Sequence, residues 1–222
     1  MHIFVDESGS FTGYHERSLS AVGALAIPSG RLGFIQKKYA KIRNRLPTEK
    51  GEVKGRLLNE QQVAEVVTML SRNNVLFEIT VADLGFHDEA EVGRYKQQHL
   101  DGMLARVDRF ADPDRQLVGE TCRQISRTSI PLYLQAITTF ELLHTLINHV
   151  PLYFVQREPH ELATFEWIID GKEPTKVTNW EMWWSWYARE VHLPTCRYGG
   201  LRWCWKALIT HFMTDSEAVI AI

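Results

Sequence analysis

The sequence lacks the cysteine and histidine patterns that mark zinc sites and disulfide-bonded domains. Its three cysteines, Cys122, Cys196 and Cys204, include no C-x-x-C pair. This excludes a zinc knuckle and a disulfide framework and fits a reducing compartment. Nine histidines are present, but none are spaced as H-E-x-x-H or H-x-x-x-H, so we do not expect a zinc hydrolase.

Three further signals are missing. No apolar run is long enough for a membrane span, and Met1 leads almost directly into a predicted strand rather than a signal peptide. There is no phosphate-binding P-loop, and Ser8 and Ser10 are not part of a G-x-S-x-G elbow, which argues against a serine hydrolase. We therefore expect a soluble, cytoplasmic protein with no membrane partner.

Composition indicates one globular domain spanning residues 1–222. The chain has 222 residues, of which 45% are hydrophobic and 23% charged, as in ordinary globular proteins. A formal net charge of −2 excludes a globally basic nucleic-acid binder but allows a local basic face.

The chain opens with a strand that leads into two carboxylates. Ile3, Phe4 and Val5 favour a buried strand, and Asp6 and Glu7 follow directly. Carboxylates at the edge of a sheet are costly to bury without a metal or a basic partner. We therefore take Asp6 as the start of a metal site.

The remaining pattern alternates strands and helices, which predicts an α/β or α+β sheet domain that begins with a β-hairpin. Predicted strands are residues 19–27, 75–81 and 164–169. Predicted helices are residues 31–46, 89–110 and 132–149. Two more helices are expected to start at capping boxes, Asn59 with Gln62 and Thr178 with Glu181. The polar stretch Ala111–Ser129, with Pro113 and Gly119, is predicted to be a long loop.

Asp170 ends a second apolar run, just as Asp6 ends the first. If the two strands are neighbours, these carboxylates lie about 5 Å apart and can share a divalent ion. Oxygen ligands favour Mg²⁺ or Mn²⁺ over zinc, and Glu52 or Glu7 could supply a third carboxylate. Two such ions could support phosphodiester cleavage. The alternative is that both aspartates only form turns or caps.

Glu52-Val53-Lys54 carries a second possibility. On one extended strand Glu52 and Lys54 project to the same side, and an E-x-K pair with an upstream aspartate is the arrangement of restriction-type nucleases. That arrangement uses Asp6, Glu52 and Lys54 and leaves Asp170 without a role. The alternative is an exposed ion pair contributing under about 1 kcal/mol.

Two features could contact nucleic acid. Lys37, Lys41 and Arg45 recur along one side of a predicted helix and are either phosphate contacts or a solvated face. Further on, an aromatic stripe at helical spacing could stack bases or form core: Trp180, Trp183, Trp184 and Tyr187.

Three motifs together resemble the bacterial and phage family named "domain of unknown function 3800". They are Asp6-Glu7-Ser8-Gly9, Glu52-Val53-Lys54 and Ile169-Asp170. The resemblance implies a ribonuclease H-like mixed sheet flanked by helices, with Asp6, Glu52 and Asp170 as metal ligands and Glu7 and Lys54 beside them. The family ends in Q-L-A-D, and this sequence stops before that motif. We therefore expect either a truncated chain or the loss of a fourth ligand.

These observations predict a Mg²⁺- or Mn²⁺-dependent nuclease acting on DNA or RNA. Asp6, Glu7, Glu52, Lys54 and Asp170 would form its catalytic site. The rival hypothesis is a non-catalytic module of the same fold that binds nucleic acid or a partner protein.

Overall fold

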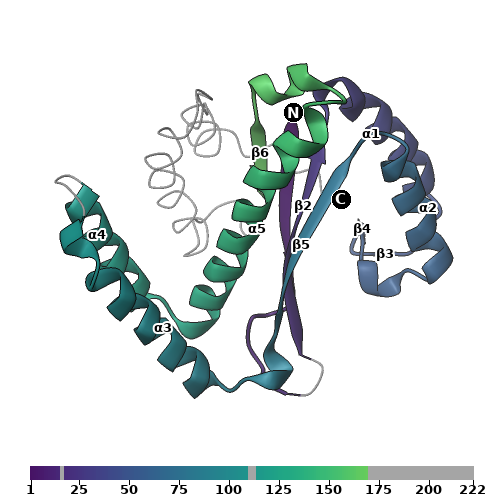
Figure 1. Ribbon diagram of the computed structural model, residues 1–222. Helices are drawn as coiled ribbons and strands as arrows, with labels where there is room; N and C mark the ends of the chain where they lie inside the picture. The colour runs from purple at the N-terminus through teal and green to yellow at the C-terminus, as the bar shows by residue number, and fades with distance from the viewer. Residues whose placement is uncertain (16–17, 110–113, 170–222) are drawn as a thin grey trace.

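The structure, a computed structural model, describes residues 1–15, 18–109 and 114–169 (Figure 1). Its strands are β1 (His2–Ser8), β2 (Leu19–Ile27), β3 (Thr48–Glu49), β4 (Glu52–Val53), β5 (Leu76–Asp83) and β6 (Glu166–Ile169). Its helices are α1 (Ser29–Arg43), α2 (Glu60–Ser71), α3 (Glu89–Leu104), α4 (Asp114–Arg127) and α5 (Ile130–Phe154). The predicted helix that starts at Thr178 and the aromatic stripe lie outside the described residues.

The main sheet is mixed, as predicted, and begins with a hairpin. Its strand order is β5-β2-β1-β6. Strands β1 and β2 are antiparallel, β2 and β5 are antiparallel, and β6 runs parallel to β1. The short strands β3 and β4 form a separate antiparallel hairpin.

Alternating side chains divide the sheet into two faces with separate cores. Ile3 and Val5 of β1 are buried against α5, in a cluster with Val22, Ala24, Leu142, Leu143, Leu146 and Trp167. Phe4 projects to the opposite face and packs with residues of β2, α1 and α2, which include Leu25, Ile27, Ile35, Ile42 and Met69. Helices therefore cover both faces, and α3 and α4 form a pair that extends away from the sheet (Figure 1).

The start of α2 confirms the predicted capping box. The Asn59 side chain accepts a hydrogen bond from the Gln62 amide, and the Gln62 side chain accepts one from the Asn59 amide. Met69 is the buried residue of this helix, and Val66 and Leu70 pack against the same cluster, whereas Val63 and Val67 are exposed.

The predicted loop Ala111–Ser129 is wrong, because α4 occupies most of it. Few residues in this segment are apolar, and most of the residues at helical spacing are polar. Cys122 is buried, and the Lys96 ammonium of α3 donates hydrogen bonds to the Ser126 and Thr128 carbonyls at 3.1 and 2.6 Å. Packing against α3, which local sequence does not reveal, stabilises this helix.

Helix α5 differs from expectation in length. It extends through Pro151 to Phe154, past the predicted end at residue 149. By length and composition it is sufficient to cross a membrane, which we did not expect from the sequence; 44% of its most apolar window is buried within the protein. Its buried residues Leu142, Leu143 and Leu146 contact the sheet core.

Candidate metal centre

The pairing of β1 with β6 underlies the candidate centre. The two strands are parallel neighbours, and their ladder runs from His2 opposite Glu166 to Val5 opposite Ile169. Asp6 directly follows Val5, and Asp170 directly follows Ile169. The condition for a shared ion, that the two strands are neighbours, is therefore met up to Val5 and Ile169. β1 continues to Ser8, so Asp6 lies within the strand and not at its end. Asp170 itself lies outside the described residues.

Asp6 is exposed on the face that carries Phe4. It pairs across the hairpin with Gly23, and its Oδ1 accepts a hydrogen bond from the Glu7 amide at 2.8 Å. Glu7 pairs with Val22, whose side chain is fully buried on the α5 face. Strand alternation therefore directs Glu7 and Asp6 to opposite faces.

Glu52 and Lys54 project to the same side of their segment, as predicted, and contact each other. The Lys54 ammonium donates a hydrogen bond to the Glu52 carboxylate. This bond, and secondarily the charge of the partner, lowers the pKa of Glu52 and raises that of Lys54. Both groups are solvent-accessible, so this pair contributes little to stability.

The β3–β4 hairpin lies on the Asp6 side of the sheet. Val53 packs against the hydrophobic cluster that contains Phe4, and Phe4 and Asp6 share a face because they are two residues apart on β1. Figure 1 shows the hairpin on the same side as α1 and α2. Among the described residues no hydrogen bond or ion pair links Asp6 to Glu52 or Lys54, so the structure brings the motifs to one face without joining them.

The three basic residues predicted to contact phosphate differ in their surroundings. Lys37 and Lys41 are exposed on successive turns of α1. Arg45 lies beyond the end of α1, and its guanidinium is bound to the Glu65 carboxylate of α2 at 2.6 Å. The prediction for Arg45 did not foresee this partner, since residues 45 and 65 meet only through the packing of α1 on α2. Lys37 and Lys41 remain available for phosphate.

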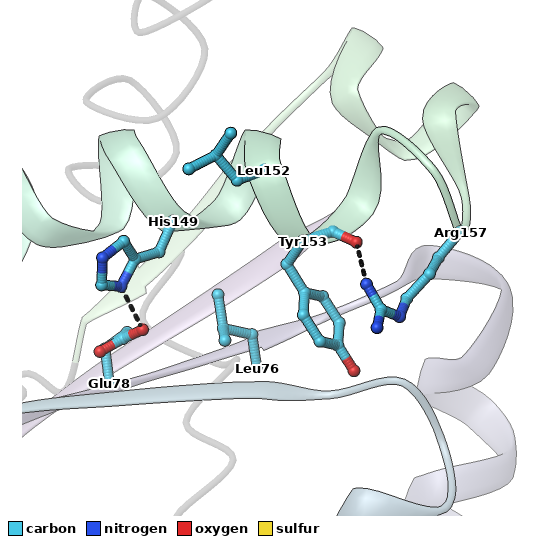
Figure 2. Close-up of a pocket in the computed structure, with 6 residues that line it drawn as sticks. All are labelled: Leu76, Glu78, His149, Leu152, Tyr153 and Arg157. Carbon is cyan, nitrogen blue, oxygen red and sulfur yellow. Dashed lines mark hydrogen bonds and ion pairs between the residues drawn. The ribbon is translucent and has the colours of Figure 1, made fainter.

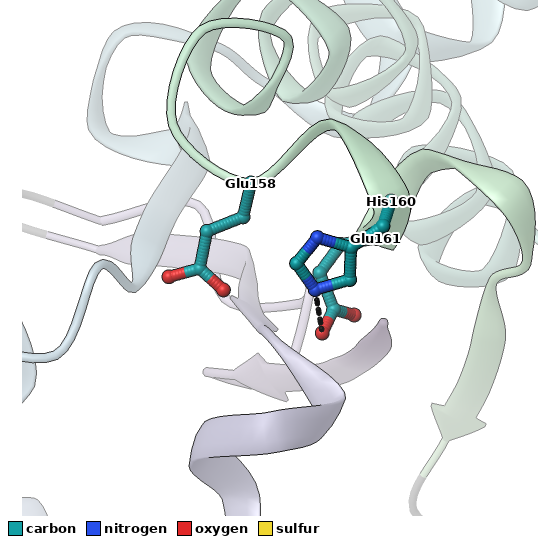
Figure 3. Close-up of side chains that lie close together, drawn as sticks. All are labelled: Glu158, His160 and Glu161. Atoms are coloured by element: carbon teal, nitrogen blue, oxygen red, sulfur yellow. Dashed lines mark ion pairs between the residues drawn. The ribbon is translucent and has the colours of Figure 1, made fainter.

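A cluster of Glu158, His160 and Glu161 could hold a metal ion, because one ligand atom from each lies within 4.8 Å of the others (Figure 3). No signal in the sequence points to this cluster, since its residues match no metal-binding spacing. Glu161 already has partners. Its carboxylate pairs with the Met1 ammonium at 3.0 Å and accepts hydrogen bonds from the Ser29 and Gly30 amides at 2.9 and 3.3 Å.

The pKa of Glu161 shows that this carboxylate is held as an anion. Burial alone would raise its pKa, but the Ser29 amide, the Met1 ammonium and the Gly30 amide together lower it to about 2. The two amides begin α1, so Glu161 also satisfies unpaired donors at a helix N-terminus. A structural role for Glu161 accounts for all these contacts.

A shallow groove of about 360 Å³ lies between α5 and β5 (Figure 2). In it His149 Nδ1 is 2.7 Å from Glu78 Oε1, and the Arg157 guanidinium stacks over the Tyr153 ring. Glu78 pairs with Ala24, which is buried on the α5 face. The groove therefore opens on the face opposite Asp6 and is separate from the candidate centre.

No protein-family model, curated protein or solved structure matches the chain. The resemblance suggested by the three motifs therefore stays a prediction.

Proposed function

We propose that this protein is a divalent-metal-dependent nuclease with a ribonuclease H-like fold. The observation that carries the proposal is the parallel β1–β6 ladder, whose last described pair, Val5 and Ile169, directly precedes Asp6 and Asp170. Neighbouring strands are about 4.8 Å apart. Two carboxylates at this spacing repel each other unless a cation lies between them.

The strand order supports the fold part of the proposal. Three antiparallel strands open the sheet, and the fourth returns parallel to the first, next to it. This is the mixed sheet with an opening hairpin that the motif resemblance implies. It places Asp6 on a central strand, at a position where the side chain is open to solvent.

In this proposal Asp6 and Asp170 bind Mg²⁺ or Mn²⁺, and Glu52 is a further ligand or positions the attacking water. The donor set fits these ions, because hard cations prefer carboxylate oxygens. Bound there, the metal would lower the pKa of a water and polarise the phosphate. Lys54 would hold Glu52 ionised and place a positive charge beside the scissile phosphate. Glu7, on the other face, would have at most an indirect role.

Cleavage of end-labelled oligonucleotides tests the proposal. Single- and double-stranded DNA and RNA are incubated with the purified chain in Mg²⁺, Mn²⁺ or EDTA. We expect cleavage of at least one substrate with metal, none in EDTA, and recovery when metal is restored. Cleavage must co-elute with the protein over two different columns. Cleavage that persists in EDTA, or its absence with all four substrates, contradicts the proposal.

The exposed lysines of α1 give a separate prediction for substrate binding. Each neutralised phosphate contributes about 0.9 to the slope of log K against log salt for duplex DNA. We expect Lys37→Gln with Lys41→Gln to reduce that slope by about 1 to 2 and to weaken binding similarly for unrelated sequences. Fluorescence anisotropy in Ca²⁺ or EDTA over a salt series measures this.

Arg45→Gln is the matched control for this pair. Arg45 is bound to Glu65, so its removal should leave the salt slope unchanged within about 0.3. If Arg45→Gln changes the slope as much as the double lysine variant does, the assignment of the phosphate contacts to Lys37 and Lys41 is wrong.

The rival function is a non-catalytic module that binds nucleic acid or a partner protein. It is favoured by the absence, in the described part of the chain, of a contact that links Asp6 to Glu52. The two functions differ in the oligonucleotide assay, because the module would show binding in the anisotropy measurement without cleavage.

A further inference from the structure

Strand β5 is the outermost strand on one side of the main sheet. The strand order is β5-β2-β1-β6, and no described strand pairs with the outer edge of β5. On such an edge the amide and carbonyl groups of alternate residues point away from the sheet and lack a partner in it. Natural edge strands prevent further pairing with lysine, proline or a short length. β5 has 8 residues and contains neither lysine nor proline, so its edge is open to another strand.

The face of β5 that lies opposite α5 is apolar and exposed. Phe77, Ile79 and Val81 alternate along the strand and are each between 51% and 59% exposed. They share this face because Glu78, between the first two, faces α5 and contacts His149. Side chains of neighbouring strands lie about 5 Å apart on a sheet face. A strand added to β5 would therefore cover this apolar row with its own alternate side chains.

The other face of β5 borders the groove that lies between this strand and α5 (Figure 2). Leu76 and Glu78 form the strand side of the groove, and Leu152 and Tyr153 form part of the helix side. Leu152 is 72% exposed. Every second side chain of a strand added outside β5 would point to this face. The edge thus offers apolar contacts on both sides of an added strand.

The groove also carries a positive charge that no described carboxylate neutralises. The Arg157 guanidinium lies 4.2 Å from the centre of the Tyr153 ring and donates a hydrogen bond to the Tyr153 carbonyl at 2.9 Å. In the described part of the chain it forms no ion pair. Glu78 is the acidic residue among those that line the groove, and it is paired with His149 at 2.7 Å. The groove is therefore complementary to an added acidic side chain.

A second copy of β5 does not supply that acidic side chain. Glu78 would be its carboxylate on the groove side, and this group is bound to His149 of its own chain. Asp83, the other acidic residue of β5, lies on the opposite face by strand alternation and accepts a hydrogen bond from the Gly85 amide at 2.9 Å. The charge of Arg157 therefore favours a chain of different sequence.

We propose that the outer edge of β5 binds an extended peptide segment of a partner protein by strand addition. Main-chain hydrogen bonds to β5 hold the segment, and the groove selects its side chains. An acidic side chain pairs with Arg157, and an apolar side chain packs against Leu152. Groove-side residues of one strand are two positions apart, so a single residue separates the acidic and the apolar one. This proposal goes beyond nuclease activity and does not depend on it.

A synthetic peptide array, incubated with the purified full chain, tests the proposal. Its peptides of about nine residues are extended strands with valine and threonine at the positions that face away from the groove. Two central positions, separated by one residue, carry every pairing of aspartate, asparagine, lysine, leucine and serine, which covers both strand directions. We expect peptides with aspartate and leucine to bind at least about fivefold more protein than those with asparagine and leucine. Equal binding of the two sets overturns the proposal.

The peptide with the strongest signal is then labelled with fluorescein and measured by anisotropy. We expect Arg157→Gln to weaken its binding about tenfold and to abolish the preference for aspartate over asparagine. Arg127→Gln is the matched control, because Arg127 is also exposed but lies at the end of α4. It should bind within about twofold of the wild type. A preference for aspartate that survives in Arg157→Gln contradicts the assignment.

Two N-methylated forms of the same peptide test strand addition itself. In one form the amides of the odd positions are methylated, and in the other those of the even positions. Amides of alternate residues point to opposite edges of a strand, so exactly one form should lose binding. Equal behaviour of the two forms overturns strand addition. A wild-type dimer in light scattering that binds none of the peptides would assign the edge to a second copy and would also overturn the proposal.

Discussion

Asp6→Asn is expected to lower metal-dependent cleavage about 1,000-fold while leaving the protein folded. Asparagine has the size of aspartate but lacks the charge that binds a divalent ion, and metal catalysis contributes several kcal/mol to transition-state stabilisation. Asp6 is exposed, so the free energy of unfolding should change by no more than about 0.5 kcal/mol. Single-turnover cleavage in Mn²⁺ and a urea melt measure the two effects.

Asp108→Asn is the control for this experiment. Asp108 is also exposed but lies in the short turn after α3, away from the sheet. It should cleave within about twofold of the wild type. If Asp6→Asn retains cleavage within tenfold of Asp108→Asn, Asp6 does not bind a catalytic metal.

Glu161→Gln is expected to have the largest effect on stability, lowering the free energy of unfolding by about 3 to 5 kcal/mol. The Met1 ammonium is fully buried against Glu161, and removing one member of a buried ion pair leaves the other charge without compensation. The variant also weakens the bonds to the Ser29 and Gly30 amides that begin α1. Urea melts of a chain with a free, unextended Met1 amino group measure the change.

Glu166→Gln gives the comparison for an exposed pair. Glu166 pairs with His2 but its side chain is mostly exposed, so its loss should change the free energy of unfolding by under about 1 kcal/mol. Equal effects of the two variants would show that burial of the Glu161 pair is not what stabilises the fold.

The lowered pKa of Glu161 predicts that the stability of the protein depends on pH. The pKa of about 2 in the folded protein lies below the ordinary value of 4.5, so the unfolded state binds the proton more readily. The contribution of Glu161 is fully present above about pH 4.5 and is lost as the pH falls toward 2, in total about 3 kcal/mol. Urea melts of wild type and Glu161→Gln between pH 6 and 2.5 should therefore converge at the acid end.

The sequence predicted the parts of this fold that depend on local pattern. Residues 3–5 and 19–27 form strands because most of their apolar side chains, among them Ile3, Val5 and Val22, are buried in the two cores of the sheet. Asn59 and Gln62 cap α2 through bonds within four residues, so the motif alone was sufficient. The adjacency of β1 and β6 was only a condition of the metal-site hypothesis, and the structure meets it up to Ile169.

The sequence did not reveal the features that long-range packing decides. Helix α4 depends on α3, which contacts it through Lys96, and no local signal marks that contact. Arg45, a predicted phosphate contact, also has Glu65 of α2 as a partner, which the sequence did not indicate. Glu161 has its partners at residues 1, 29 and 30, far away in sequence. These residues carry charges whose partners only the folded chain brings into contact.

The melting temperature in EDTA, Mg²⁺ and Mn²⁺ tests the central claim, that Asp6 and Asp170 form a metal site, most directly. A ligand at 100 times its dissociation constant stabilises the native state by about 2.7 kcal/mol, which raises the melting temperature of a chain of this size by about 5 to 10 °C. We predict such a rise in Mn²⁺ for the wild type and for Asp108→Ala. It should be absent in the double variant of Asp6→Ala with Asp170→Ala. An equal rise in the double variant, or no rise in the wild type at millimolar metal, would contradict the claim.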